Sequence, residues 1–218
     1  MTAPGSPVEL PLVAIYADES CLGNGREGEN PGGAAGVIEY AIPATGQLSR
    51  WDYWISEPAT TNNRMALRSA IEAFNVLGRK GNIFRVLFTS DSQYLVKGMT
   101  EWVHGWAGRG WRRREGAIEN LELWQQLVNV AAPHFPQWNW VRGHAGHPQN
   151  EYANDLAVAA ARGQTSSDGA KPSHFDEWLE EQRAKKRVTV EPAPFPAGGK
   201  FVAARPLPRT GPASSAVD

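Results

Sequence analysis

Hydrophobic and polar positions follow two different periods along the first three quarters of the chain. Residues 12–17 form a mostly apolar run that ends at Asp18, which is typical of a strand buried on both faces of a sheet. Residues 36–41 and 48–56 predict two further strands in an antiparallel meander. From about residue 62 the apolar side chains recur at helical spacing, and Gly78 is placed to end that helix.

The second part of the pattern repeats a strand, a carboxylate and a helix. Residues 83–88 predict a strand that leads to Asp91 and then to a helical pattern. A further helix is predicted over 121–131, a strand over 138–142 and a last helix over about 150–162. In open α/β sheets, ligands lie beyond the carboxyl ends of the strands. The two strands that end in Asp18 and Asp91 therefore predict one site at that edge.

Composition separates one domain from its flanking segments. We expect a flexible arm over 1–11, a single domain over 12–163, and a Pro/Ala/Gly-rich tail over 164–218. Within the tail, a capping-box pattern predicts a short helix at 173–187. Residues 188–218 carry six prolines and are expected to be disordered.

Cysteine content and charge limit the cellular setting and the partners. The single cysteine, Cys21, excludes an intramolecular disulfide, and the sequence has neither a signal peptide nor an 18-residue apolar run. We therefore expect a soluble, cytoplasmic protein without membrane contact, and a monomer. The formal net charge of −1 argues against a globally basic nucleic-acid binder, although locally clustered charge can still bind nucleic acid.

Four segments together resemble the type 1 ribonuclease H family of the bacterial kind. They occur in the family's order and span about residues 12 to 162: Tyr16-Ala17-Asp18-Glu19-Ser20-Cys21-Leu22-Gly23-Asn24, Thr60-Thr61-Asn62-Asn63-Arg64-Met65-Ala66-Leu67, Thr89-Ser90-Asp91-Ser92-Gln93-Tyr94, and the stretch from Trp140 to Ala157. The resemblance implies an α/β ribonuclease H-like fold with a five-stranded mixed sheet, three antiparallel strands followed by two parallel ones, and helices on both faces. It also implies a metal-dependent endonuclease that hydrolyses the RNA strand of RNA/DNA hybrids.

The sequence departs from the family at two of its four catalytic carboxylates. In the family these groups hold two Mg²⁺ ions, for which Mn²⁺ can substitute. Asp18 and Asp91 match two of the four positions, whereas Ala66 stands in place of a glutamate and Asn154 in place of an aspartate. The alternative interpretation of the two aspartates is helix capping. Ala66 is interpreted as an ordinary helix alanine. Asn154 can still offer an amide oxygen to a metal ion, but this neutral group is a weaker ligand than a carboxylate.

Two neighbouring acids are candidates for replacing the missing charge. Glu19 stands where the family usually has glycine and is a candidate metal ligand, although strand alternation would point its side chain away from that of Asp18. Asp155 lies about 100° further round its helix than Asn154, so we expect it to face solvent or to pair with an arginine.

Further positions match family residues that assist the reaction or contact the substrate. His144, between Gly143 and Gly146, matches a mobile-loop histidine that assists proton transfer; otherwise it is a plain surface histidine. His147 is expected to support the turn before Pro148. The expected contacts with the hybrid come from Asn24, Asn62, Asn63 and Gln93, which otherwise would serve as caps and turn residues. The stretch with Trp102, Trp106, Arg109, Trp111, Arg112, Arg113 and Arg114 resembles the basic protrusion that grips the DNA strand, the alternative being a packed helical hairpin with solvated arginines.

Two functions from different classes follow from these matches. The first is a ribonuclease H-like endonuclease whose metal site has been altered. The second is a catalytically deficient protein that binds RNA/DNA hybrids or double-stranded RNA. Ala66 and Asn154 are also substitutions that an experimenter would choose to trap a substrate complex. Because Glu19 departs from the pattern as well, the three linked changes favour a naturally diverged subgroup.

Overall fold

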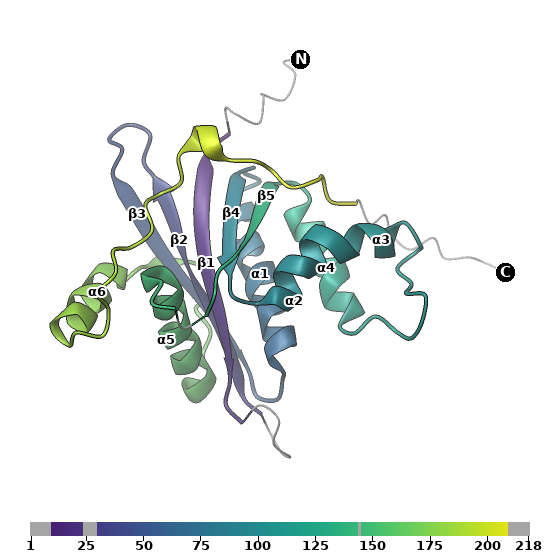
Figure 1. The fold of residues 1–218 in the computed structure, drawn as a ribbon, viewed down its shortest axis with the longest axis horizontal. Coiled ribbons are helices and arrows are strands. Elements are labelled where there is room, and N and C mark those ends of the chain that lie inside the picture. Colours follow the sequence, from purple (N-terminus) through teal and green to yellow (C-terminus); the bar gives the residue numbers. More distant parts are fainter. Residues whose placement is uncertain (1–9, 24–29, 144, 209–218) are drawn as a thin grey trace.

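The structure, a computed structural model, describes residues 10–23, 30–143 and 145–208. One mixed sheet contains strands in the order β5-β4-β1-β2-β3-β6 (Figure 1). The strands are β1 Leu12–Cys21, β2 Gly32–Ala41, β3 Leu48–Glu57, β4 Arg85–Ser90, β5 Phe135–Trp140 and β6 Lys171–Pro172. The helices are α1 Asn62–Gly78, α2 Gln93–Lys97, α3 Val103–Ala107, α4 Leu121–Ala131, α5 Pro148–Gly163 and α6 Phe175–Ala184; a π-helical turn, Gly98–Trp102, joins α2 to α3, and a 3₁₀ turn covers Gly198–Lys200.

The strand pairing confirms the predicted topology, with one addition. β1 pairs antiparallel with β2 and parallel with β4, and β4 pairs parallel with β5. The expected number of strands, five, was wrong, because β6 pairs antiparallel with β3 through Trp51 and Asp52. A two-residue strand that contains Pro172 has no alternating pattern, so the sequence offered no signal for it.

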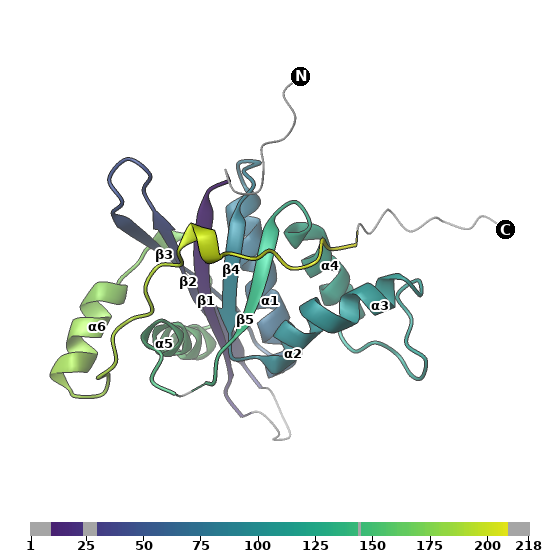
Figure 2. The ribbon, with the colours of Figure 1, turned by 45° about the horizontal axis from the view of Figure 1, so that its top comes forward.

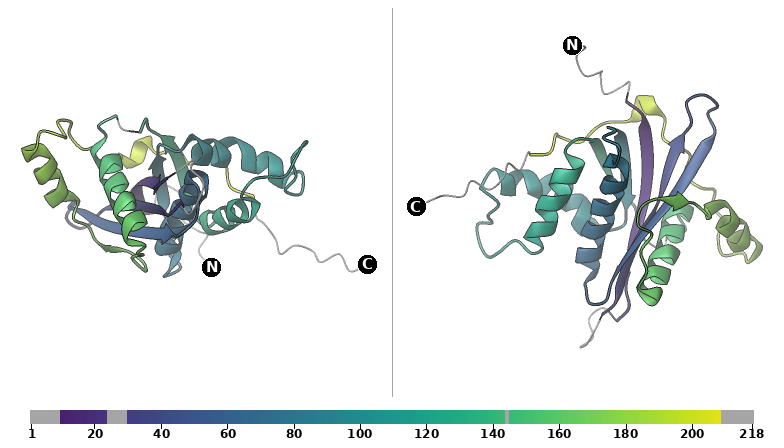
Figure 3. Two further views of the ribbon diagram at one scale, coloured as in Figure 1. Left: turned by 90° about the horizontal axis from the view of Figure 1, so that it is seen from below. Right: turned by 180° about the vertical axis from the view of Figure 1, so that it is seen from behind.

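Helices cover both faces of the sheet (Figures 1 and 3). α1, backed by α4, lies on one face, and α5 lies across β1, β2 and β3 on the other, with α6 beside it. The side chains of β1 alternate between these layers: Val13, Ile15 and Ala17 pack on the α1 side, and Ala14 and Tyr16 on the α5 side. The continuous apolar run of β1 is therefore explained by burial on both faces, as predicted.

Aromatic packing fixes the segment that follows β4. Trp124 of α4 is fully buried and lies against the π-helical turn at Gly98, where an added Cβ would fall 1.9 Å from the Trp124 Cη2 atom. Only glycine permits this approach. The same indole donates a 3.0 Å hydrogen bond to the Tyr94 hydroxyl, so α2, α3 and α4 form one packed unit beside the sheet.

The C-terminal segment folds back onto the domain, which corrects the expectation of disorder for its described part. Residues 188–208, here called the C-terminal strap, run from α6 across the sheet to β5 (Figure 2). Val188 is 7% exposed, and Ala204 N donates to Pro136 O at 2.7 Å. Proline-rich chain can pack in an extended form without any apolar periodicity, which is why the pattern gave no sign of it. No helix in the described part of the chain is long and apolar enough to span a membrane.

Candidate active site

Three carboxylates meet where β4 ends and β1 continues past it. Oxygens of Asp18, Glu19 and Asp91 all lie within 4.8 Å of one another. The parallel register accounts for this, because Ala17 pairs with Ser90, so that Asp18 and Asp91 are the next residues on adjacent chains. The predicted meeting of Asp18 and Asp91 is thus present, although β1 continues to Cys21 and does not end at Asp18, and Glu19 joins them.

Glu19 reaches this cluster although it leaves β1 on the opposite face from Asp18. Asp18 follows the Tyr16 side of the strand, toward α5, whereas Glu19 follows the Ala17 side, toward α1. β4 ends at Ser90, so the edge of β1 beside Asp18 and Glu19 has no neighbouring β4 backbone. The two carboxylates can therefore converge around that free edge, and strand alternation does not separate them as expected.

Ala66, which stands where the family has a glutamate, lies on the same face of the sheet as Glu19. Ala66 is 1% exposed in α1 and packs with the core on the α1 side of the sheet. A glutamate there would approach the site from the same side as Glu19. The carboxylate absent from α1 thus has a counterpart on the same face, carried by β1.

The orientation of Asp18 is fixed by two donors. Asn150 in α5 donates from Nδ2 to Asp18 Oδ2 at 2.8 Å, and the backbone N of Glu19 donates to Asp18 Oδ1 at 2.7 Å. Asn150 lies within the segment that resembles the family, yet no role was predicted for it. Asn154 follows one helical turn later on the same face of α5 and is half-buried. Asp155 is exposed, as expected, and accepts a 2.8 Å hydrogen bond from Trp178 Nε1.

Asp91 is enclosed by the segment that leaves β5. Trp140 Nε1 donates to the carbonyl oxygen of Asp91 at 2.9 Å. At Gly143 an added Cβ would lie 2.1 Å from Asp91 Oδ2. The chain entering the histidine loop therefore passes directly against a carboxylate of the site, a contact that any side chain at position 143 would block.

The electrostatics of the cluster favour a bound cation. Burial raises the pKa of Asp18 to about 8, and the charges of Asp91 and Glu151 add to the shift. The pKa of Glu19 is raised well above its usual value by burial and then by Asp18 and Asp91, while a hydrogen bond with Ser92 opposes the shift. Hard divalent cations prefer carboxylate oxygens, and several carboxylates are needed where such ions bind in a pair. The all-oxygen donor set and the mutual repulsion of its members fit Mg²⁺ or Mn²⁺.

The predicted histidines are described only in part. His144 and Asn24 lie outside the described residues. His147 occupies the position before the first turn of α5, and its ring lies 5.3 Å from that of Tyr16. Burial lowers the pKa of His147, so the neutral imidazole is favoured, as suits a packing role beside the turn.

The expected nucleic-acid residues that the structure describes lie at the starts of α1 and α2, in the π-helical turn and α3, and in the chain that follows α3 up to residue 114. Asn62 and Asn63 open α1, and Gln93 opens α2. Asn62 Oδ1 is buried and accepts no hydrogen bond from the described residues. In the tryptophan and arginine stretch the tryptophans pack against the core and arginines 112–114 are exposed, as the packed-hairpin alternative expects; its contact with the DNA strand stays a prediction.

A pocket of about 290 Å³ lies within this aromatic unit, and no sequence pattern had indicated it. Its lining includes Tyr94, Trp102 and Trp106 together with Arg113. The ring centroids of Trp102 and Trp106 are 5.7 Å apart, and those of Trp106 and Trp124 are 5.6 Å apart. The ring planes of Trp102 and Trp106 are inclined by 45° and those of Trp106 and Trp124 by 69°, so these rings pack tilted and edge-on, and the pocket lining also includes Glu119.

The fold and the carboxylate edge define a ribonuclease H, and the chain belongs to that family. The family model for RNase H matches residues 11–162. The ribonuclease H of Pelobacter propionicus is 42% identical over 160 residues, covering 73% of this chain and 87% of the relative. These findings confirm the resemblance described from the sequence.

A solved structure adds a particular relative. The chain is 60% identical to LC9-RNase H1, described as a type 1 RNase H with the type 2 active-site motif; the match has a TM-score of 0.84 and covers 91% of this chain and 94% of that one. The RNase H domain of PFV, 16% identical with a TM-score of 0.57 over 72% of this chain and 98% of that one, shows the fold alone.

Proposed function

We propose that the protein hydrolyses the RNA strand of RNA/DNA hybrids with divalent metal held by Asp18, Glu19, Asp91 and Asn154. The observation that carries the proposal is the convergence of three carboxylates within 4.8 Å. Family membership supports the activity. The 60% identical relative described as having the type 2 active-site motif supports a site that differs from the usual type 1 pattern.

The chain's own residues would divide the work as follows. Mg²⁺, or Mn²⁺ in its place, would supply activation of a water molecule and stabilisation of the leaving oxygen. Asp18 presents carboxylate oxygens whose directions are set by Asn150 and the Glu19 backbone. His144 is proposed to assist proton transfer.

Substrate binding is proposed for the edge around the site and for the aromatic unit. Asn62, Asn63 and Gln93, with Asn24, would contact the hybrid near its 2′-hydroxyls. Trp102, Trp106, Trp111 and the arginines at 109 and 112–114 would bind the DNA strand through its phosphates. The protein is also proposed to be a monomer and to act in the cytoplasm.

Cleavage of an end-labelled RNA/DNA hybrid in Mg²⁺ and in Mn²⁺ tests this function. Asp18→Asn and Glu19→Gln should each reduce the rate at least about a hundredfold, since each removes a proposed ligand charge. Glu122→Gln, at an exposed glutamate in the first turn of α4, is the matched control and should cleave like the parent.

The outcomes separate the two candidate functions. If Asp18→Asn abolishes cleavage and Glu19→Gln does not, Glu19 is a bystander and the metal site needs only the aspartates. A parent protein that binds the hybrid tightly but never cuts it would instead establish the binding protein, the alternative that the changes at Ala66 and Asn154 favour.

A further inference from the structure

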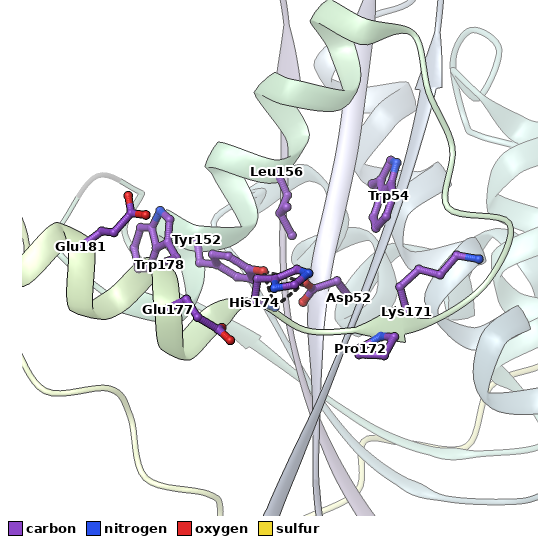
Figure 4. A pocket seen from close by; sticks show the side chains of 10 residues that line it. All are labelled: Asp52, Trp54, Tyr152, Leu156, Lys171, Pro172, His174, Glu177, Trp178 and Glu181. Carbon is purple, nitrogen blue, oxygen red and sulfur yellow. Dashed lines mark hydrogen bonds between the residues drawn. The ribbon is translucent and has the colours of Figure 1, made fainter.

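Three buried polar side chains of the domain, Asp52, Glu39 and Gln149, are linked to the segment beyond the matched residues 11–162. The first, Asp52, is 2% exposed and accepts hydrogen bonds from the Tyr152 hydroxyl at 2.5 Å and from the His174 backbone N at 3.3 Å (Figure 4). This pair of contacts holds the start of α6 against α5 and β3.

The second position is Glu39 on β2, the strand next to β3 in the sheet. Glu39, fully buried in β2, accepts a 2.8 Å ionic hydrogen bond from Arg50 Nε. The same guanidinium binds Asp176 Oδ1 at 2.8 Å and lies 4.9 Å above the Phe175 ring. Both positions join α6 to buried acids of the sheet, far along the chain from the catalytic carboxylates.

The third position lies beside the active site. Gln149, also fully buried, donates from Nε2 to Ala193 O at 2.9 Å and accepts from Ala193 N at 3.1 Å through Oε1. Its amide therefore pairs with both backbone groups of one strap residue, as a neighbouring strand would. The strap also passes the preceding loop, since an added Cβ at Gly146 would lie 3.9 Å from Val190.

Gln149 precedes Asn150, which holds Asp18. The N-terminal N–H groups of a helix lack partners within the helix, so the first turn opens more easily than the middle. Gln149 and Asn150 both lie in that first turn of α5. Gln149 pairs with the strap and Asn150 with Asp18, so the first turn of α5 is held closed by contacts on two sides.

We infer that Gln149 is a positioning residue, through which the C-terminal strap sets the orientation of Asn150 and hence of Asp18. The inference rests on the proposed function for its effect on catalysis. The contact by which the strap keeps the first turn of α5 closed does not depend on whether the protein is active.

Two glutamines offer a matched comparison. Gln137 Oε1 accepts a 2.9 Å hydrogen bond from Val202 N, so it also pairs with strap backbone, but on β5 and away from α5. Gln149→Leu and Gln137→Leu are the same chemical change. Ala193→Pro removes the backbone N–H donor from the strap side and provides a second disruption, made on the strap, at a residue packed against the core on the α5 side.

We would measure kcat and KM on the hybrid, together with hydrogen–deuterium exchange of the metal-free proteins. Gln149→Leu should lower kcat about tenfold with KM within about twofold, the size expected when a group that orients a metal ligand is lost. In the Gln149→Leu variant, hydrogen–deuterium exchange of the backbone amides should be faster in residues 145–153. Gln137→Leu should match the parent in both measurements, and adding Ala193→Pro to Gln149→Leu should cause no further loss, since the proline removes a donor whose acceptor is already absent.

Each outcome decides the inference. An active parent with an unchanged kcat in Gln149→Leu overturns it, and so do equal losses in the two leucine variants, which would indicate general stabilisation by the strap. If the parent does not cut the hybrid, the proposed function fails, and exchange alone decides: faster exchange restricted to the Gln149→Leu and Ala193→Pro variants supports the positioning role, and unchanged exchange refutes it.

Discussion

Replacing Asp18 with asparagine is expected to stabilise the metal-free protein. Asp18 is 5% exposed, and its pKa is raised from 3.8 to about 8 by burial and then by repulsion from Asp91. Between these two values the unfolded chain has released a proton that the folded chain keeps. The free energy of unfolding therefore falls as the pH rises from about 4 to about 8, and levels off above that range.

The size of the effect follows from that interval. At pH 7 the interval spans about 3 pKa units at about 1.4 kcal/mol each, so the stability lost because folding must protonate Asp18 is at most about 4 kcal/mol. Asparagine removes the charge but loses one of the two hydrogen bonds with Asn150 and the Glu19 backbone, at about 1 kcal/mol. We expect a net gain of about 1 to 3 kcal/mol, where about 2 kcal/mol raises Tm by roughly 4 to 8 °C in a protein of this size.

Thermal unfolding in EDTA, followed by circular dichroism at about pH 5 and about pH 9, measures this difference. The parent should lose stability between the two conditions and the Asp18→Asn variant should lose less. Added Mg²⁺ should raise the Tm of the parent more than that of the variant, because a bound ion stabilises only the state that binds it. Glu122→Gln, which changes an exposed carboxylate, should follow the parent throughout. A variant less stable than the parent at the higher pH would refute the reasoning.

Three further predictions follow from the site. In a Glu19→Gln background, Ala66→Glu should restore at least about tenfold of the lost cleavage rate, because the new carboxylate enters from the same face as Glu19; no recovery would contradict the assigned face. Gly143→Ala should reduce cleavage and cost about 1 to 3 kcal/mol in urea unfolding, since its Cβ meets Asp91 Oδ2; parent-like rate and stability would show that the loop moves aside. Replacing Arg112, Arg113 and Arg114 with alanine should weaken hybrid binding and reduce the slope of log affinity against log salt by up to about 3; an unchanged slope in fluorescence anisotropy would exclude them from the interface.

The main elements and half of the site could be predicted because they depend on local pattern and strand order. The apolar run of β1 and the helical period of α1 gave their places, and the parallel pairing of β1 with β4 brings Asp18 and Asp91 to neighbouring positions. Strand alternation gave the wrong expectation for Glu19. That rule assumes neighbours on both sides, and the end of β4 at Ser90 is a tertiary feature that no local pattern reports.

The C-terminal strap could not be predicted for a different reason. Its described residues are held by scattered partners such as Gln149, Gln137 and Pro136, each distant in sequence. Composition alone indicated disorder, since proline-rich chain lacks the apolar period of a helix or strand. The buried polar residues of the core gave the missing signal: Glu39, Asp52 and Gln149 are costly to bury unless partners reach them, and the strap or α6 is linked to each.

In the proposed site a carboxylate on β1, Glu19, takes the place of one on α1, which changes how the site would be assembled. A ligand at position 66 would depend on how α1 packs against the sheet, whereas Glu19 shares one continuous backbone with Asp18. The distance between these two ligands is then set by β1 alone, and Asp91 is held to β1 by the adjacent parallel register. Asn154 differs, because α5 must carry it to the site. With three carboxylates and a neutral amide, the fourth ligand adds no charge, so its contribution depends on position rather than attraction. That makes the closure of the first turn of α5, through Gln149 and Asn150, more consequential here than in a site with four carboxylates.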